Sequence, residues 1–74
     1  SNIMILSLDE VLRIKNELME KYSISLHIHD TCGGQCFSIE TKDLKHIEEL
    51  KEYFKTKKYN LSFSNDNLRF KIKD

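Results

Sequence analysis

The sequence predicts a small α+β domain built as two tandem units, each a helix followed by a β-hairpin. Two segments repeat apolar residues at three- and four-residue steps, and each is followed by short stretches in which apolar and polar residues alternate. The apolar positions of the two helical segments correspond at one constant spacing: Val11, Ile14 and Leu18 with Ile47, Leu50 and Phe54. We expect a single domain over residues 1–74, with repeat units over about 7–41 and 43–73.

The predicted architecture is a four-stranded antiparallel sheet with both helices on one face. The alternative is a ferredoxin-like arrangement, which uses the apolar run Ile3–Leu6 as its first strand and has one strand added at the end. Without that role, Ile3–Leu6 is a lead-in to the first helix. Ser1-Asn2 is interpreted as a remnant of tag cleavage.

The first helix is predicted to begin after Ser7 and to end near Lys21. Ser7 and Glu10 have the spacing of a capping box, in which the two side chains satisfy amides of the first turn. The apolar stripe of this helix comprises Leu8, Val11, Leu12, Ile14, Leu18 and Met19. A first strand follows from about Ile24.

The first hairpin is predicted to turn at Gly33-Gly34, because glycine adopts the backbone angles of a two-residue turn without strain. This register places Ile28 opposite Ile39 and Asp30 opposite Phe37. The apolar residues of both strands then share one face, whereas a shift by one residue would mix apolar and polar side chains.

The second unit repeats this plan. Asp43 is the predicted N-cap of a helix that frays near Lys57-Lys58, where positive charge suits the negative end of the helix dipole. A second two-residue turn at Asn65-Asp66 would pair its flanking strands. The expected partners in that hairpin are Leu61 and Phe63 with Leu68 and Phe70.

Charge and composition argue against several classes of partner. The chain has 12 basic and 12 acidic residues, so it has no general attraction for nucleic acid or an anionic membrane. No apolar stretch approaches the length of a membrane span. Lysines late in the second helix, such as Lys51 and Lys55, are interspersed with glutamates, a pattern typical of a solvated helix face.

Two cysteines are too few for a disulfide framework, and we therefore expect a cytoplasmic protein with reduced thiols. In the predicted hairpin, Cys32 and Cys36 project from opposite faces. A bond between them would need a distorted turn.

The first hairpin holds most of the residues with chemical potential. The predicted register gives one face His27, His29 and Cys36, with His27 opposite Glu40, His29 opposite Ser38, and Cys36 diagonal to His29. Imidazole and thiolate ligands of this kind suit zinc or another transition metal. The competing interpretation is a solvent-facing strand in which His27 and Glu40 form a simple cross-strand pair.

The turn Asp30-Thr31-Cys32-Gly33-Gly34-Gln35, followed by Phe37, resembles the Asp-Ala-Cys-Gly-Gly-Gln turn of the RDAC family of small bacterial proteins. This chain has His29 where that motif has Arg, and Thr31 where it has Ala. The resemblance implies a functional role for Asp30, Cys32, Gly33, Gly34 and Gln35. It implies no particular activity, because none is established for the family.

We expect a binding or regulatory module without a cofactor rather than an enzyme, because so small a domain has little room for a substrate pocket. The expected binding surface is the hairpin 25–41, and the expected partner is another protein or a second copy of this chain. The alternative function is a carrier or sensor for a transition metal, or for sulfur or selenium, that uses His27, His29, Cys36 and Cys32.

Overall fold

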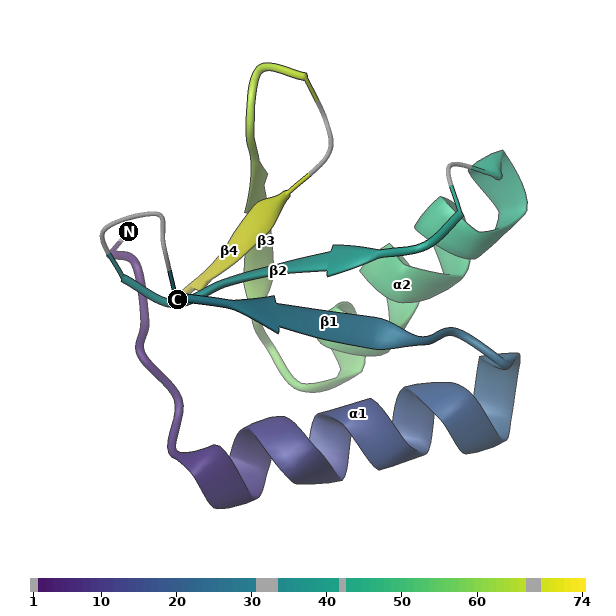
Figure 1. Ribbon diagram of the computed structural model, residues 1–74, viewed down its shortest axis with the longest axis horizontal. Coiled ribbons are helices and arrows are strands. Elements are labelled where there is room, and N and C mark those ends of the chain that lie inside the picture. Colours follow the sequence, from purple (N-terminus) through teal and green to yellow (C-terminus); the bar gives the residue numbers. More distant parts are fainter. Residues whose placement is uncertain (1, 31–33, 42, 67–68) are drawn as a thin grey trace.

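The computed structural model describes residues 2–30, 34–41, 43–66 and 69–74, and within them it contains two helices and four strands (Figure 1). Their order is α1 (Leu8–Tyr22), β1 (Leu26–His29), β2 (Cys36–Ile39), α2 (Leu44–Thr56), β3 (Asn60–Phe63) and β4 (Phe70–Lys73). The strands form one antiparallel sheet in the order β1-β2-β4-β3. The predicted α+β class and the helix–hairpin order are confirmed, and an internal sequence repeat stays a prediction.

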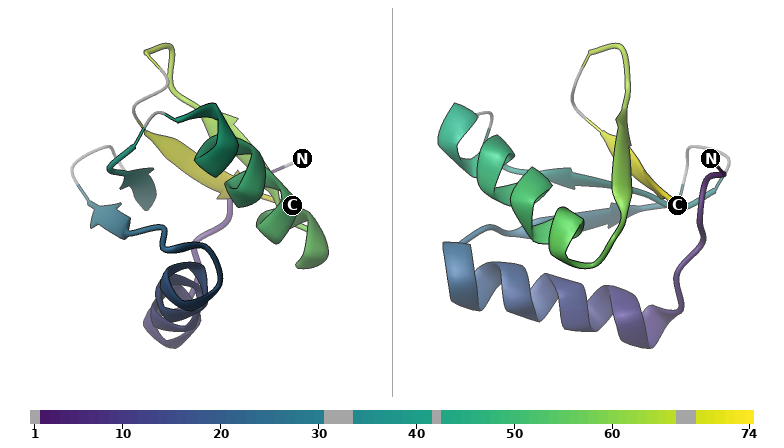
Figure 2. Two further views of the ribbon diagram at one scale, coloured as in Figure 1. Left: turned by 90° about the vertical axis from the view of Figure 1, so that its right-hand side faces the viewer. Right: turned by 180° about the vertical axis from the view of Figure 1, so that it is seen from behind.

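Both helices lie on the same face of the sheet (Figure 2). The stripe of α1 buries Val11, Ile14 and Leu18, and that of α2 buries Leu50, Tyr53 and Phe54. They join the inward-facing strand residues in a single hydrophobic cluster, to which the sheet contributes Leu26, Phe37, Phe70 and Ile72. We call the opposite side of the sheet the open face.

The helix termini follow the sequence signals. Ser7 Oγ accepts a hydrogen bond from the Glu10 amide at 3.2 Å, which confirms Ser7 as the N-cap of α1. Asp43 Oδ1 caps α2 by accepting from the Lys45 amide at 3.1 Å. At the end of α1, Ser23 adopts the left-handed conformation at φ 57°, and its amide donates to Met19 O at 3.0 Å.

The register of both hairpins differs from the prediction by two residues. Ile28 pairs with Phe37 in the first hairpin, and Phe63 pairs with Phe70 in the second. A shift of two residues leaves each side chain on the same face of the sheet, so the hydrophobic pattern does not distinguish the two registers. Asn65-Asp66 does lie in a turn, but the connection is longer than two residues.

The two hairpins meet at the centre of the sheet. Within the described residues, β2 and β4 are paired at one position, Phe37 with Phe70, and the hairpins diverge from there (Figure 1). The rings of these residues have centroids 5.7 Å apart, and Phe70 also lies against Phe54 and Phe63 at 6.1 and 5.6 Å. Aromatic packing therefore reinforces the junction between the hairpins.

The N-terminal segment lies beside β4. Ile3 forms an isolated antiparallel bridge with Lys73, and the Met4 amide donates to Ile72 O at 2.8 Å. The ferredoxin-like alternative required a strand over Ile3–Leu6, whereas the chain forms a single bridge there. Neither α1 nor α2 could span a membrane, and no other helix is found in the described part of the chain.

Candidate functional site

The histidines of the first hairpin each have a polar partner on the open face. His27 Nε2 lies 3.2 Å from Glu40 Oε1, and His29 Nε2 lies 2.7 Å from Ser38 Oγ. These are the pairs that the sequence predicted as directly opposite. Because the register is shifted, His27 is opposite Ser38 and His29 is opposite Cys36, and both contacts run diagonally between the strands.

Cys36 is buried, with 1% of its surface exposed, and it is disulfide-bonded. The expectation of reduced thiols is therefore wrong for this residue. That expectation rested on the small number of cysteines and was supported by a two-residue turn that would point them to opposite faces. The longer connection between β1 and β2 removes the second argument. Cys32, the other cysteine, lies outside the described residues.

The disulfide changes the proposed metal site, because zinc binds a thiolate and not a disulfide sulfur. Among the described residues, no group of three or more His, Cys, Asp or Glu side chains is placed to hold a metal ion. Metal binding by His27, His29 and Cys36 stays a prediction, and it applies to the reduced chain.

The turn residues with described positions are Asp30, Gly34 and Gln35, whereas Cys32 and Gly33 lie outside the described residues. The Gln35 side chain binds the backbone of Leu6 twice: Oε1 accepts from the Leu6 amide at 2.9 Å, and Nε2 donates to Leu6 O at 3.1 Å. The side-chain amide of Gln35 thus pairs with both backbone groups of Leu6, as a residue on a neighbouring strand would. Its contacts give Gln35 a structural role that the sequence did not reveal.

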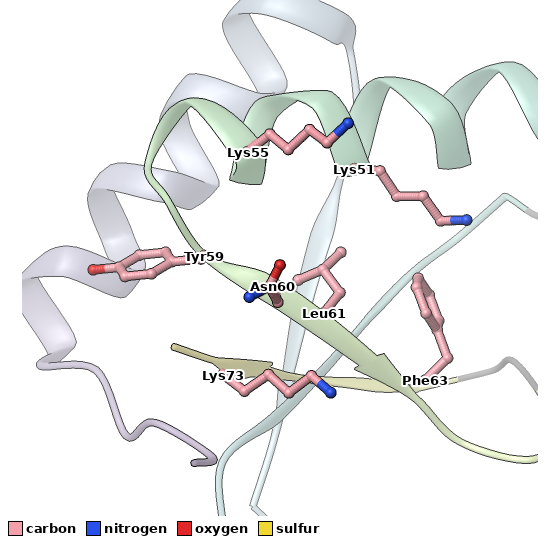
Figure 3. Close-up of a pocket in the computed structure, with 7 residues that line it drawn as sticks. All are labelled: Lys51, Lys55, Tyr59, Asn60, Leu61, Phe63 and Lys73. Atoms are coloured by element: carbon pink, nitrogen blue, oxygen red, sulfur yellow. The ribbon is translucent and has the colours of Figure 1, made fainter. Parts of the chain in front are cut away.

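A second site lies between α2 and the edge of the sheet, where sequence analysis predicted only a solvated helix face. This groove has a volume of about 490 Å³. Its lining residues are Lys51, Lys55, Tyr59, Asn60, Leu61, Phe63 and Lys73, and we call it the lysine groove. Figure 3 shows Lys51 and Lys55 reaching from α2 on one side of β3, with Lys73 on the other side.

The lysines of the groove differ from their neighbour Lys57. Lys57 Nζ lies 3.7 Å from both Glu10 and Glu17, so its charge is balanced within the chain. Within the described part of the chain, Lys51, Lys55 and Lys73 form no ion pair. The groove therefore has three ammonium groups that form no ion pair within the described part of the fold.

The lysine groove also exposes backbone groups of β3 that can form hydrogen bonds with a partner. β3 is the last strand of the sheet, and its ladder with β4 continues through the bond from the Ser64 amide to Arg69 O at 2.8 Å. Hydrogen-bonded pairs alternate along an antiparallel ladder, so the amide and carbonyl groups of Leu61 and Phe63 point away from β4. Within the described residues, these outward groups have no hydrogen-bond partner.

The signal for the groove was hard to find in the sequence. Lys73 is far from Lys51 and Lys55 along the chain, and pairing with Asn60 brings it to the edge strand.

Comparisons with protein-family models, with curated proteins and with solved structures gave no match. The resemblance to the RDAC family stays a prediction, and the candidate site rests on the geometry of this chain.

Proposed function

We propose that this chain is a non-catalytic binding module that takes up an extended polypeptide segment as an additional strand on the free edge of β3. The observation that supports this most directly is the set of outward amide and carbonyl groups of Leu61 and Phe63. An added strand offers the same alternation of donors and acceptors, so it satisfies both kinds of group.

This alternation favours a polypeptide over a nucleic acid. A phosphate backbone would satisfy the amides but would bring negative oxygens towards the carbonyls of Leu61 and Phe63. The zero net charge of the chain also gives no general attraction for nucleic acid. The groove beside β3 supplies space for side chains of the bound segment.

The sequence placed the binding surface on the hairpin 25–41, and the structure leads us to prefer the opposite edge of the sheet. On that hairpin, His27 and His29 already have polar partners in Glu40 and Ser38. At β3, the outward backbone groups have no hydrogen-bond partner and the groove lysines have no ion-pair partner among the described residues. A partner with carboxylates therefore gains ion pairs with the groove lysines at this edge.

The proposal is tested by blocking one backbone donor. Short random peptides are selected by display against the immobilised chain, and their affinities are measured for chains made by chemical synthesis. An Nα-methyl group on Leu61 removes an outward donor but leaves the ladder between β3 and β4 intact. We expect affinity to fall at least about tenfold.

The matched control carries an Nα-methyl group on Leu44 instead. Leu44 is the first residue of α2, and its amide has no acceptor within the helix. We expect its affinity to equal that of the unmodified chain, with both chains showing the same circular dichroism. Equal affinity for the chain methylated at Leu61, or a failure to select any peptide, would overturn the proposal.

A further inference from the structure

We infer that the segment bound at β3 is acidic and contains consecutive Asp or Glu residues, which are held between Lys51 and Lys55 on one side of the strand and Lys73 on the other. This inference rests on the proposed strand addition. It specifies the chemistry of the partner, which the backbone groups of β3 do not determine.

The requirement for consecutive acidic residues follows from the placement of the lysines. Neighbouring side chains of a strand point to opposite faces of the sheet. On the helix side, an added strand meets Lys51 and Lys55; on the open face, it meets Lys73, which pairs with Asn60 across the ladder (Figure 3). Because lysines stand on both sides, two successive carboxylates each find an ammonium group.

The charges within the groove support an acidic partner. Lys51 Nζ lies 5.7 Å from the centroid of the Phe63 ring, which stabilises the ammonium group beside β3. Glu48 and Glu52 share α2 with the groove lysines but form no ion pair with them in the described structure. Carboxylates of a partner would therefore reduce the repulsion among the lysines without displacing an existing pair.

Two synthetic peptides test this inference directly. One has four consecutive Glu residues between Val and Thr residues, and the other has Gln at the same four positions. We expect the Glu peptide to bind at least about tenfold more tightly in calorimetric titration at low salt. The difference should shrink at high salt, because salt screens exposed charges.

Protein variants locate the interaction. Lys51→Gln combined with Lys73→Gln should weaken binding of the Glu peptide at least about tenfold. Lys15→Gln combined with Lys45→Gln is the matched control, because these exposed lysines lie outside the groove and the change in net charge is the same. We expect that control to bind within about twofold of the unmodified chain. Equal losses in the two double variants would overturn the inference.

The outcomes also separate this inference from the proposed function. If the Glu and Gln peptides bind with equal affinity, and Nα-methylation of Leu61 weakens the binding of both, strand addition stands and the inference of an acidic partner is wrong. If the Glu peptide binds regardless of methylation, strand addition is wrong. A thymidine oligonucleotide serves as a competitor. If it displaces the Glu peptide at a concentration below the dissociation constant of that peptide, the inference of a polypeptide partner is wrong.

Discussion

The Tyr53 hydroxyl of α2 donates a hydrogen bond to the Glu17 carboxylate of α1. Tyr53 is 3% exposed, and its ring packs edge-on against Tyr22 and Phe54. Lys57 approaches the same pair, with its Nζ 3.7 Å from Glu17 Oε1 and 5.7 Å from the Tyr53 ring centroid. These contacts join the two helices above the sheet and hold α2 in the position that forms one wall of the lysine groove.

Tyr53→Phe should lower the free energy of unfolding by about 1 kcal/mol, because it removes one hydrogen bond while keeping the ring. Urea denaturation followed by circular dichroism measures the change. Tyr59→Phe is the control, since the Tyr59 hydroxyl makes no hydrogen bond within the described residues and its loss should leave stability unchanged. An equal effect of the two substitutions would contradict this assignment.

The hydrogen bond between Tyr53 and Glu17 makes the free energy of unfolding depend on pH in both the acidic and the alkaline range. The Tyr53 hydrogen bond lowers the pKa of Glu17 below 4.5, so its contribution is present above that pH and is lost as the pH falls towards the lower folded value. Burial, followed by the contact with Glu17, raises the pKa of Tyr53 above 10.0. That contribution is present below pH 10.0 and is lost as the pH rises towards the folded value.

Unfolding curves measured between acidic and alkaline pH test this dependence. Stability should fall in both windows for the unmodified chain, and Tyr53→Phe should show a smaller fall in each. In the alkaline window the difference is clearest, because the substitution removes the titrating group. If the stability of the two proteins changed with pH in parallel, groups other than Tyr53 and Glu17 would be responsible for the pH dependence.

Gln35→Ala should loosen the attachment of Leu6, at the end of the N-terminal segment, while the contacts of Ile3 and Met4 with β4 remain. It removes two hydrogen bonds to Leu6, and we expect a loss of about 1–2 kcal/mol in stability and faster hydrogen exchange at the Leu6 amide. Gln35→Met separates hydrogen bonding from packing, because it keeps the length of the side chain without the amide. The assignment fails if Met restores the slow exchange of Leu6.

The oxidation state of Cys36 can be read by mass spectrometry. Iodoacetamide should leave Cys36 unlabelled until a reductant is added, because its sulfur is in a disulfide. After reduction, the metal hypothesis predicts that zinc adds to the chain and that His29→Ala abolishes the addition. Labelling of Cys36 without reductant would contradict the disulfide, and zinc uptake unaffected by His29→Ala would contradict the proposed ligands.

The predictable part of this fold follows from local patterns. The apolar stripes and the caps at Ser7 and Asp43 depend on residues close in sequence, and the structure confirms them. Hairpin register was not predictable, because a shift of two residues preserves both faces of each strand. The predicted contact of His27 with Glu40 forms despite the different register, because the Glu40 side chain reaches the diagonal position on the neighbouring strand.

The lysine groove and the disulfide were missed for reasons of tertiary structure. Lys51, Lys55 and Lys57 look alike in sequence, and only the packing of α2 on α1 brings Lys57 to Glu10 and Glu17. Lys73 reaches the same region through strand pairing. The state of Cys36 depends on a connection whose length the hydrophobic pattern did not determine.

Among the described residues, β2 and β4 pair only at Phe37 and Phe70, and this has a mechanical consequence for the sheet. Few main-chain bonds join β2 and β4 within the described residues, so ring packing around Phe70 contributes to the angle between the two hairpins. Phe70→Leu would keep an apolar side chain but lose three aromatic contacts, and the hairpins would then rotate more freely about their crossing point. We therefore expect the Phe70 side chain to contribute to the torsional stiffness of this small domain.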